Sequence, residues 1–189
     1  MRRAWERLRE HGGASLEYVL ITHVHLDHAG GAHARLLVQH PARRRLLKGA
    51  KYLVDPSRIV SLEDGGELRL GGATLRLVVT PGHASHSSAW YLVGNRVLFS
   101  GDSAGMLVVG EGWFVRPTAP PPFRVDMFLD SLSKPESLDP LMVCMPHYGC
   151  TRRARRYLRR RVDPAPRGSR SSESSANPPC RGMRLSTAS

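Results

Sequence analysis

Short apolar segments separated by glycine-rich turns make up the middle of the chain. The segments form two pairs: residues 67–70 with 74–79, and residues 89–93 with 96–99. Gly71-Gly72 separates the first pair and Gly94-Asn95 separates the second. Two strand-like segments around a short turn of this composition predict a β-hairpin. We therefore predict two consecutive hairpins in this part of the chain.

Other segments predict further strands and several helices. The strands are expected at residues 16–22, 51–54, 106–109 and 141–145, and the helices at residues 3–10, 32–39, 123–133 and 152–161. The helix at 123–133 rests on apolar residues at helical spacing, among them Phe128 and Leu132. The proline-rich stretch at 117–122 cannot continue a helix or a central strand, so we predict a loop there.

A run of three histidines and an aspartate follows the first predicted strand directly. His23 and His25 are two residues apart, so in an extended chain their side chains point the same way. Asp27 and His28 follow where we expect the chain to turn into a helix. Imidazole and carboxylate are ligands for zinc and iron, so the run predicts a metal site.

Three more candidate ligands each follow an apolar segment further along the chain. His83 comes after residues 75–79, and Asp102 and His147 come after the next two predicted strands. Side chains placed at strand ends converge on one edge of a sheet, where loops carry chemistry. The sequence therefore predicts that these residues join the histidine run.

The complete pattern resembles the metallo-β-lactamase superfamily, whose signature is HxHxDH followed by a distant His, Asp and His. The resemblance covers roughly residues 16–150 and fills all seven positions in order. It implies an α+β fold, the αβ/βα sandwich. It also implies two metal pockets, with His23, His25 and His83 in the first, Asp27, His28 and His147 in the second, and Asp102 bridging them.

The same resemblance implies a metal-dependent hydrolase in which a metal-bound hydroxide attacks an ester, thioester or lactone. Asp27 would both ligate and accept the proton of the water. Two zinc ions per chain are the expected cofactor, with iron or manganese as alternatives. Iron members of the flavodiiron type have Glu at the second His position, and His25 at that position favours zinc. The chain looks most like small hydrolases related to glyoxalase II.

Three alternative functions stay open at this point. A phosphodiesterase or nuclease would use the same two-metal chemistry on an anionic substrate. A persulfide dioxygenase would need a single iron. A truncated fragment without catalysis is the third, because only 22 residues precede His23, and we expect the opening strands of the sandwich to be missing.

Four residues beside the seven ligand positions each have two competing roles. His86 follows His83 closely and is a candidate to line the site, although a loop histidine held by hydrogen bonds fits equally. Tyr148 is a candidate donor to the substrate, with packing as the competing role. Ser85 and Ser87 either orient His83 or shape its turn.

The net charge of +12 is concentrated in the C-terminal part of the chain. Residues 151–189 carry 11 arginines against two acidic residues, while the rest carries 17 basic and 14 acidic residues. We therefore divide the chain into a metallo-β-lactamase-like domain at 1–158 and an Arg-, Ser- and Pro-rich tail at 159–189, which we expect to be disordered. The nearly neutral charge of residues 1–150 argues against a nucleic-acid partner.

Cysteine content and hydropathy indicate the compartment. The three cysteines, Cys144, Cys150 and Cys180, form no CxxC pair and are odd in number, which is typical of a reducing compartment. The first residues lack the apolar stretch of a signal peptide, and no apolar run approaches the ~20 residues that span a bilayer. We expect a cytoplasmic protein with a small-molecule substrate and no membrane partner, and leave a homodimer open.

Overall fold

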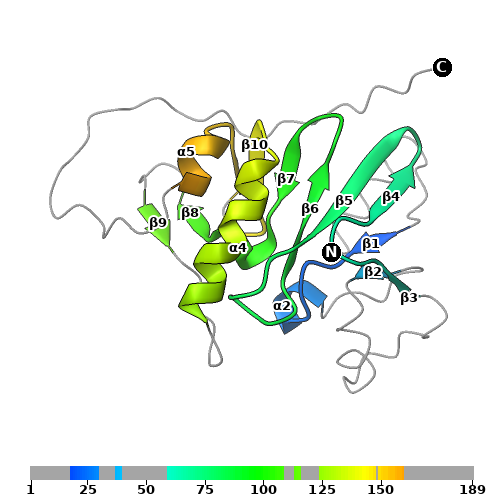
Figure 1. Ribbon diagram of the computed structural model, residues 1–189, viewed down its shortest axis with the longest axis horizontal. Helices are drawn as coiled ribbons and strands as arrows, with labels where there is room; N and C mark the ends of the chain where they lie inside the picture. The colour runs from blue at the N-terminus through cyan, green and yellow to red at the C-terminus, as the bar shows by residue number, and fades with distance from the viewer. Residues whose placement is uncertain are drawn as a thin grey trace, which may run out of the picture.

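A mixed β-sheet lies at the centre of the chain, with helices on one face and a small parallel sheet on the other (Figure 1). The computed structural model describes residues 18–29, 37–39, 59–108, 113–115, 124–147 and 149–159. The predictions for residues 3–10, residues 51–54 and the tail beyond residue 159 lie outside the described residues.

The central sheet has six strands in the order β11-β10-β7-β6-β5-β4. Their bounds are Glu67–Leu70 for β4, Ala73–Val79 for β5, Ser88–Leu92 for β6, Val97–Phe99 for β7, Met142–Met145 for β10 and Gly149–Thr151 for β11. Antiparallel pairing of β4 with β5 and of β6 with β7 confirms both predicted hairpins. β10 pairs with β7 in the parallel sense and with β11 in the antiparallel sense.

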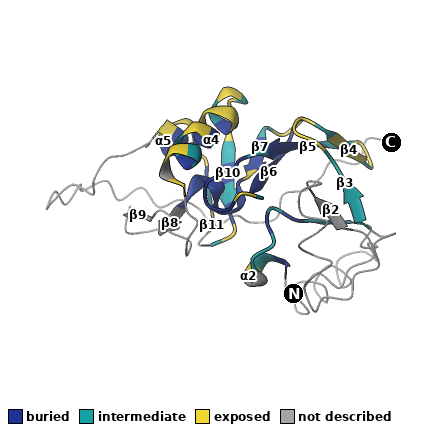
Figure 2. Ribbon diagram, turned by 60° about the horizontal axis from the view of Figure 1, so that its bottom comes forward, coloured by how far each residue is buried: buried dark blue, intermediate teal, exposed yellow. Residues whose placement is uncertain are grey.

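Successive side chains along a strand point to opposite faces of the sheet, and both faces of this sheet are apolar. On one face, Tyr91, Leu98 and Val143 pack against Phe128 and Leu132 of a long helix. That helix is α4 (Val125–Ser137), and α5 (Ala154–Arg159) joins the same core. On the other face, a second cluster is built around Leu77, Trp90 and Leu92. Figure 2 shows the buried central strands between the exposed outer sides of α4 and α5 and the N-terminal strands. The helices, the central sheet and the small parallel sheet thus lie in successive layers, as the predicted sandwich requires.

The small sheet contains a strand where the sequence predicted a helix. Its strands β1 (Val19–Leu20), β2 (Leu37–Gln39) and β3 (Ile59–Ser61) are parallel, with β2 in the middle. The helix predicted at 32–39 is therefore wrong at 37–39. Periodicity cannot separate a short buried strand from a helical turn, and the main chain of β2 finds partners on both sides.

The remaining elements are short, apart from α4. α2 (Leu26–Ala29) begins inside the histidine run, where a helix start was predicted, and η3 is a 3₁₀ turn at Gly101–Ala104. β8 (Met106–Val108) pairs with β9 (Trp113–Val115). α4 starts and ends later than the predicted 123–133. No helix among the described residues is long and apolar enough to cross a membrane.

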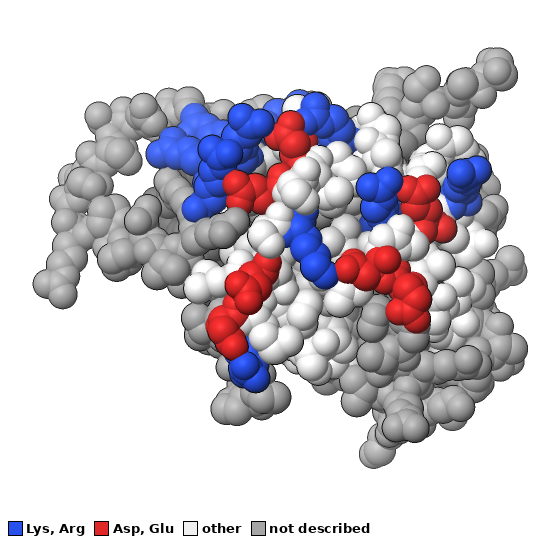
Figure 3. Space-filling model, in the orientation of Figure 1, with Lys and Arg blue, Asp and Glu red and all other residues white. Residues whose placement is uncertain are grey.

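Exposed arginines gather over α5 and the residues before it (Figure 3). Two of them pair with acidic residues near the end of α4: Arg155 lies 3.2 Å from Asp139, and Arg159 lies 2.9 Å from Glu136. Exposed ion pairs of this kind contribute little to stability. α5 confirms the predicted basic helix over residues 154–159.

Gly82 allows the loop after β5 to lie directly against α4. Its φ is 135°, and a Cβ atom there would lie 2.4 Å from the Cα of Phe128. The amide of Arg124 also donates to the carbonyl of Gly82 at 3.2 Å. This contact sets where the loop carrying His83 leaves the sheet.

We expect Gly82→Ala to lower the free energy of unfolding by roughly 2 kcal/mol or more, because main-chain atoms of α4 cannot move aside. Gly72→Ala is the matched control: its φ is 83°, but no described atom lies within 4 Å of the added Cβ. The control should cost only about 1 kcal/mol. Urea unfolding measures both, and equal losses would contradict the steric explanation.

Candidate metal centre

The parallel strands of the central sheet bring three predicted ligands to one edge. β5, β7 and β10 all run in the same direction, since β6 is antiparallel to both β5 and β7 and β10 is parallel to β7. His83, Asp102 and His147 follow the C-terminal ends of these strands. The histidine run joins the same edge because Thr22 accepts a hydrogen bond of 2.8 Å from the Ser88 amide at the start of β6.

Three histidines form the first group. The ligand nitrogens of His23, His25 and His83 all lie within 4.8 Å of one another. The Nε2 atom of His83 is 3.1 Å from the Nδ1 atom of His25. The His23 and His83 residues are buried, at 1% and 5% exposure. This is the set that the resemblance assigned to the first metal, and the structure brings it together.

Asp27, His28 and His147 form a second group with ligand atoms inside the same 4.8 Å limit. The Asp27 carboxylate lies 3.3 Å from Nε2 of His28 and 3.5 Å from Nε2 of His147. The Asp27 side chain is 59% exposed, whereas that of His28 is 9% exposed. The second group therefore opens to solvent through Asp27.

Asp102 lies between the two groups. Its Oδ2 atom is 3.3 Å from Nε2 of His83 and 3.8 Å from Nε2 of His23, both in the first group. The same oxygen is 3.4 Å from Nε2 of His28, and Oδ1 is 3.6 Å from Nε2 of His147. The Asp102 carboxylate thus faces all the histidines of both groups except His25. A ligand that bridges two metals needs this position between the groups.

The donor set fits metal cations. Among the described residues, three buried atoms at the centre have no hydrogen-bond partner: Nε2 of His23, Nε2 of His28 and Oδ1 of Asp102. Buried polar atoms without partners are costly. A cation coordinated by these atoms would offset that cost, and five imidazoles and two carboxylates at such short range match zinc or iron chemistry. The ligand roles themselves stay predictions.

Burial keeps His23 neutral. Loss of solvation, followed by repulsion from His28, lowers the pKa of His23 from 6.5 to about 2. A neutral imidazole carries a lone pair for a metal across the physiological pH range. The hydrogen bond of 3.2 Å between His23 Nδ1 and Thr22 Oγ1 orients the ring. Donation from Nδ1 to that oxygen leaves Nε2 for coordination.

The pKa of His28 shifts in the opposite direction, because two carboxylates lie beside it. Burial alone would lower its pKa, but Asp102 and then Asp27 outweigh burial and raise it. Burial has the opposite effect on a carboxyl group and would raise the pKa of Asp102. The neighbouring His28 outweighs burial, so the pKa of Asp102 is lowered overall. Asp102 is therefore held as a carboxylate, the form that ligates metal.

Sequence reasoning missed Thr22 as a residue of the site. Besides its contact with His23, Thr22 packs against Gly101, whose φ is 52° and whose added Cβ would lie 2.7 Å from Thr22 Cβ. Gly101 therefore lets η3, which carries Asp102, approach the histidine run. Only the position of Thr22 directly before the run hinted at this role.

Hydroxyl groups hold the loops around the site. Thr80 donates to Ser103 at 2.6 Å, which joins the end of β5 to η3. Ser87 accepts a hydrogen bond of 3.2 Å from the Ala84 amide, so its oxygen shapes the turn after His83. This contact favours the turn-shaping role over direct orientation of His83.

His86 lies beside the first group. Its ring centroid is 5.7 Å from that of His25 and 6.4 Å from that of His23. The structure thus places His86 at the edge of the site, where the sequence suggested it. Its catalytic role stays a prediction, as does that of Tyr148, which lies outside the described residues.

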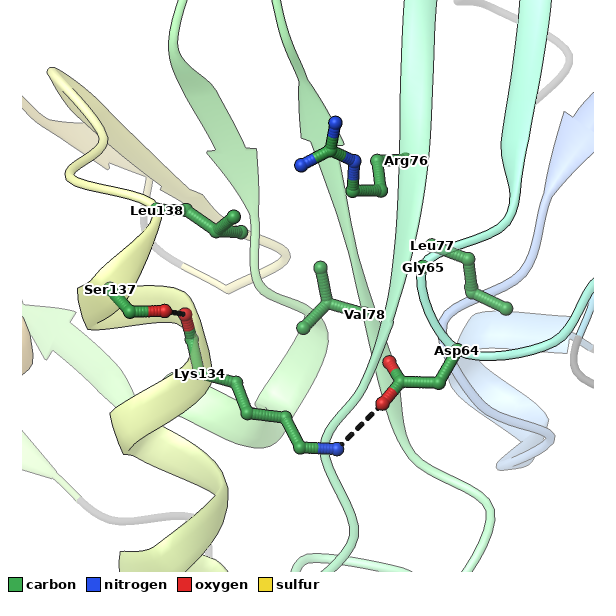
Figure 4. Close-up of a pocket in the computed structure, with 8 residues that line it drawn as sticks. All are labelled: Asp64, Gly65, Arg76, Leu77, Val78, Lys134, Ser137 and Leu138. Atoms are coloured by element: carbon green, nitrogen blue, oxygen red, sulfur yellow. Dashed lines mark hydrogen bonds and ion pairs between the residues drawn. The ribbon is translucent and has the colours of Figure 1, made fainter.

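A pocket of about 210 Å³ lies elsewhere, between α4 and β5 (Figure 4). Lys134 of α4 and Asp64 meet across it at 2.7 Å, with Arg76, Leu77 and Val78 on the strand between them. Both charged groups are already paired, and none of the lining residues is a predicted ligand. The pocket therefore contributes nothing to the metal centre.

Comparison with known proteins settles the family. The sequence profile of the metallo-beta-lactamase superfamily matches residues 1–147. The chain belongs to the metallo-beta-lactamase superfamily. The crystal structure of the archaeal superfamily protein ST1585 from Sulfolobus tokodaii superposes with a TM-score of 0.62 at 25% identity, over 76% of this chain and 65% of that one. The predicted αβ/βα sandwich is thereby confirmed.

Curated relatives include a metallo-beta-lactamase fold-containing protein and two thioesterases. ST1585 of Sulfurisphaera tokodaii is 29% identical over 164 residues, covering 71% of this chain and 61% of the relative. Thioesterase pkgB of Emericella nidulans is 37% identical, over 58% of this chain and 29% of the relative. An atrochrysone carboxyl ACP thioesterase of Aspergillus fumigatus is 36% identical, over 59% of this chain and 35% of the relative. The chain thus spans less than two thirds of each of these relatives.

Proposed function

We propose that this chain is a metal-dependent hydrolase that cleaves a thioester, ester or lactone with two zinc ions. The observation that carries the proposal is the pair of His/Asp groups with Asp102 between them. The similarity to two proteins named as thioesterases supports the substrate class. A cytoplasmic location and a small-molecule substrate, without nucleic acid or membrane, belong to the same proposal.

When bound, two zinc ions would polarise the substrate carbonyl and lower the pKa of the attacking water. The first group would hold its ion rigidly, because His23 and His83 are buried and His23 is oriented by Thr22. Asp102 would keep the two positions together and balance positive charge with its carboxylate.

Asp27 is placed to move a proton. It is the most exposed carboxylate of the centre, and it contacts His28 and His147 of the second group. A carboxylate at the solvent edge of the site is able to accept the proton of the attacking water and release it to bulk solvent. In the proposal, Asp27 performs this step.

We expect His86→Ala to reduce kcat/KM by about 10–100-fold while zinc content stays unchanged, because His86 borders the first group without belonging to it. Elemental analysis and steady-state kinetics on the same preparation separate the two effects. His86→Asn, which keeps a hydrogen-bonding amide, is the matched control and should recover part of the loss. Loss of zinc in either variant would make His86 a ligand instead.

The test of the substrate class is a hydrolysis screen with the zinc-loaded chain. Acyl thioesters, aryl esters and lactones are compared with a phosphodiester of similar size. The proposal predicts turnover of a carbonyl substrate, loss of turnover on chelation, and recovery with added zinc. Turnover of the phosphodiester alone would replace this proposal with the nuclease-type alternative.

A further inference from the structure

Two cysteines face each other across the hairpin that carries His147. Cys144 of β10 is the direct partner of Cys150 of β11, and the next pair, Met145 with Gly149, closes the hairpin. His147 lies in the loop between these last partners. Both cysteines are thiols and both are half-buried. Figure 2 shows β10 and β11 side by side at one end of the buried sheet.

The register places the two thiols within reach of each other. Directly opposite residues on antiparallel strands have Cα atoms about 4.5 or 5.5 Å apart, depending on the type of pair. Disulfides form at Cα separations of roughly 4.4–6.8 Å. Partners in register also point to the same face of the sheet, so the sulfur atoms of Cys144 and Cys150 lie on one side.

The surroundings leave the pair accessible to small reagents. Cys144 packs at the border of the cluster around Trp90. On the side away from β11, Cys144 pairs with Phe99 of β7, which is 39% exposed. Gly149, beside Cys150, is exposed. This end of the sheet therefore offers an approach to the sulfur atoms without unfolding.

We propose that Cys144 and Cys150 form a reversible dithiol site that reacts with low-molecular-weight disulfides of the glutathione type. One thiolate attacks the small disulfide and releases one small thiol, which leaves a mixed disulfide. The second cysteine then attacks the protein sulfur, forms the Cys144–Cys150 bond and releases the second small thiol. The protein loses two electrons and two protons, and the small disulfide gains both.

The location connects this site to the metal centre, and this part of the inference rests on the proposed function. Opposite Cβ atoms lie about 4.5–5.5 Å apart, whereas a disulfide holds them at about 3.8 Å. Closing the pair moves the strands that hold His147, whose Nε2 lies 3.5 Å from Asp27 and 3.6 Å from Asp102. Ligand-to-metal distances lie within about 0.2 Å of their usual values, so we expect the disulfide to weaken metal binding by the second group.

The first arm of the test uses intact mass. The full chain with Cys180→Ser is incubated with oxidised glutathione, since Cys180 lies outside the hairpin. We expect the loss of two hydrogen atoms and reversal by dithiothreitol. With Cys144→Ser or Cys150→Ser added, the chain should instead gain one glutathione. Glutathione adducts on the Cys180→Ser chain, or an unchanged mass, would overturn the proposal.

The second arm measures zinc retained against a chelator in reduced and oxidised chains. Oxidation of the Cys180→Ser chain should release zinc at a lower chelator concentration. A chain with all three cysteines replaced by serine is the matched control and should not respond. Disulfide formation with equal zinc retention would overturn the link to the metal centre. A reduced chain that holds no zinc would instead refute the proposed function, and the mass arm would stand.

Discussion

Replacing Asp102 with alanine is expected to remove most of the bound metal and to lower kcat/KM by at least about 10³-fold. This loss exceeds the roughly 10–100-fold typical of residues outside a ligand set. The reason is position: Asp102 approaches His23 and His83 of the first group and His28 and His147 of the second. Without its carboxylate, two cations would also face each other without the negative charge between them. Elemental analysis and a hydrolysis assay measure the two effects.

Asp130→Ala is the matched control, because Asp130 lies exposed on α4. It should leave zinc content and activity unchanged. Thermal unfolding of both variants without metal separates loss of ligation from loss of fold. An Asp102→Ala chain that keeps its zinc and its activity would contradict the bridging role.

Acidification should remove metal from the second group. Asp102 and Asp27 raise the pKa of His28 above its usual value in the metal-free chain. A metal binds only the deprotonated imidazole, so protons compete with it increasingly as the pH falls through that raised pKa. Above the raised pKa the competition disappears. Below it, affinity should fall about tenfold per pH unit for each displaced proton.

Zinc titrations over a pH series measure this dependence, and the release of protons on metal binding gives a second readout. His28→Gln is the control, since the amide has no proton to lose, and its weaker binding should depend less on pH. An affinity that stays constant as the pH falls below the raised pKa of His28 would contradict the account.

The strands next to the metal centre were predictable because the local sequence pattern and the tertiary packing favour the same structure there. Gly94-Asn95 between two apolar segments specifies a hairpin by itself, and the structure forms it. The convergence of His83, Asp102 and His147 followed from their positions after apolar segments, because parallel strands end at one edge. Their division into two groups came from the family resemblance and not from spacing.

Features that depend on distant partners could not be predicted. β2 is a strand because β1 and β3 pair with its two edges, and nothing in its three residues specifies that. The role of Thr22 depends on the close approach of Gly101 from another loop. Likewise, Cys144 and Cys150 are six positions apart in sequence, and only the register of β10 with β11 makes them partners.

The metal content of the full chain tests whether the two groups form a metal centre. Folded protein purified without added metal is measured by elemental mass spectrometry against its concentration. The two His/Asp groups predict about two zinc ions per chain, the number that a bridged site with two pockets holds. About one iron per chain would point to the dioxygenase alternative. Absence of stoichiometric metal in folded protein would contradict the proposed hydrolase.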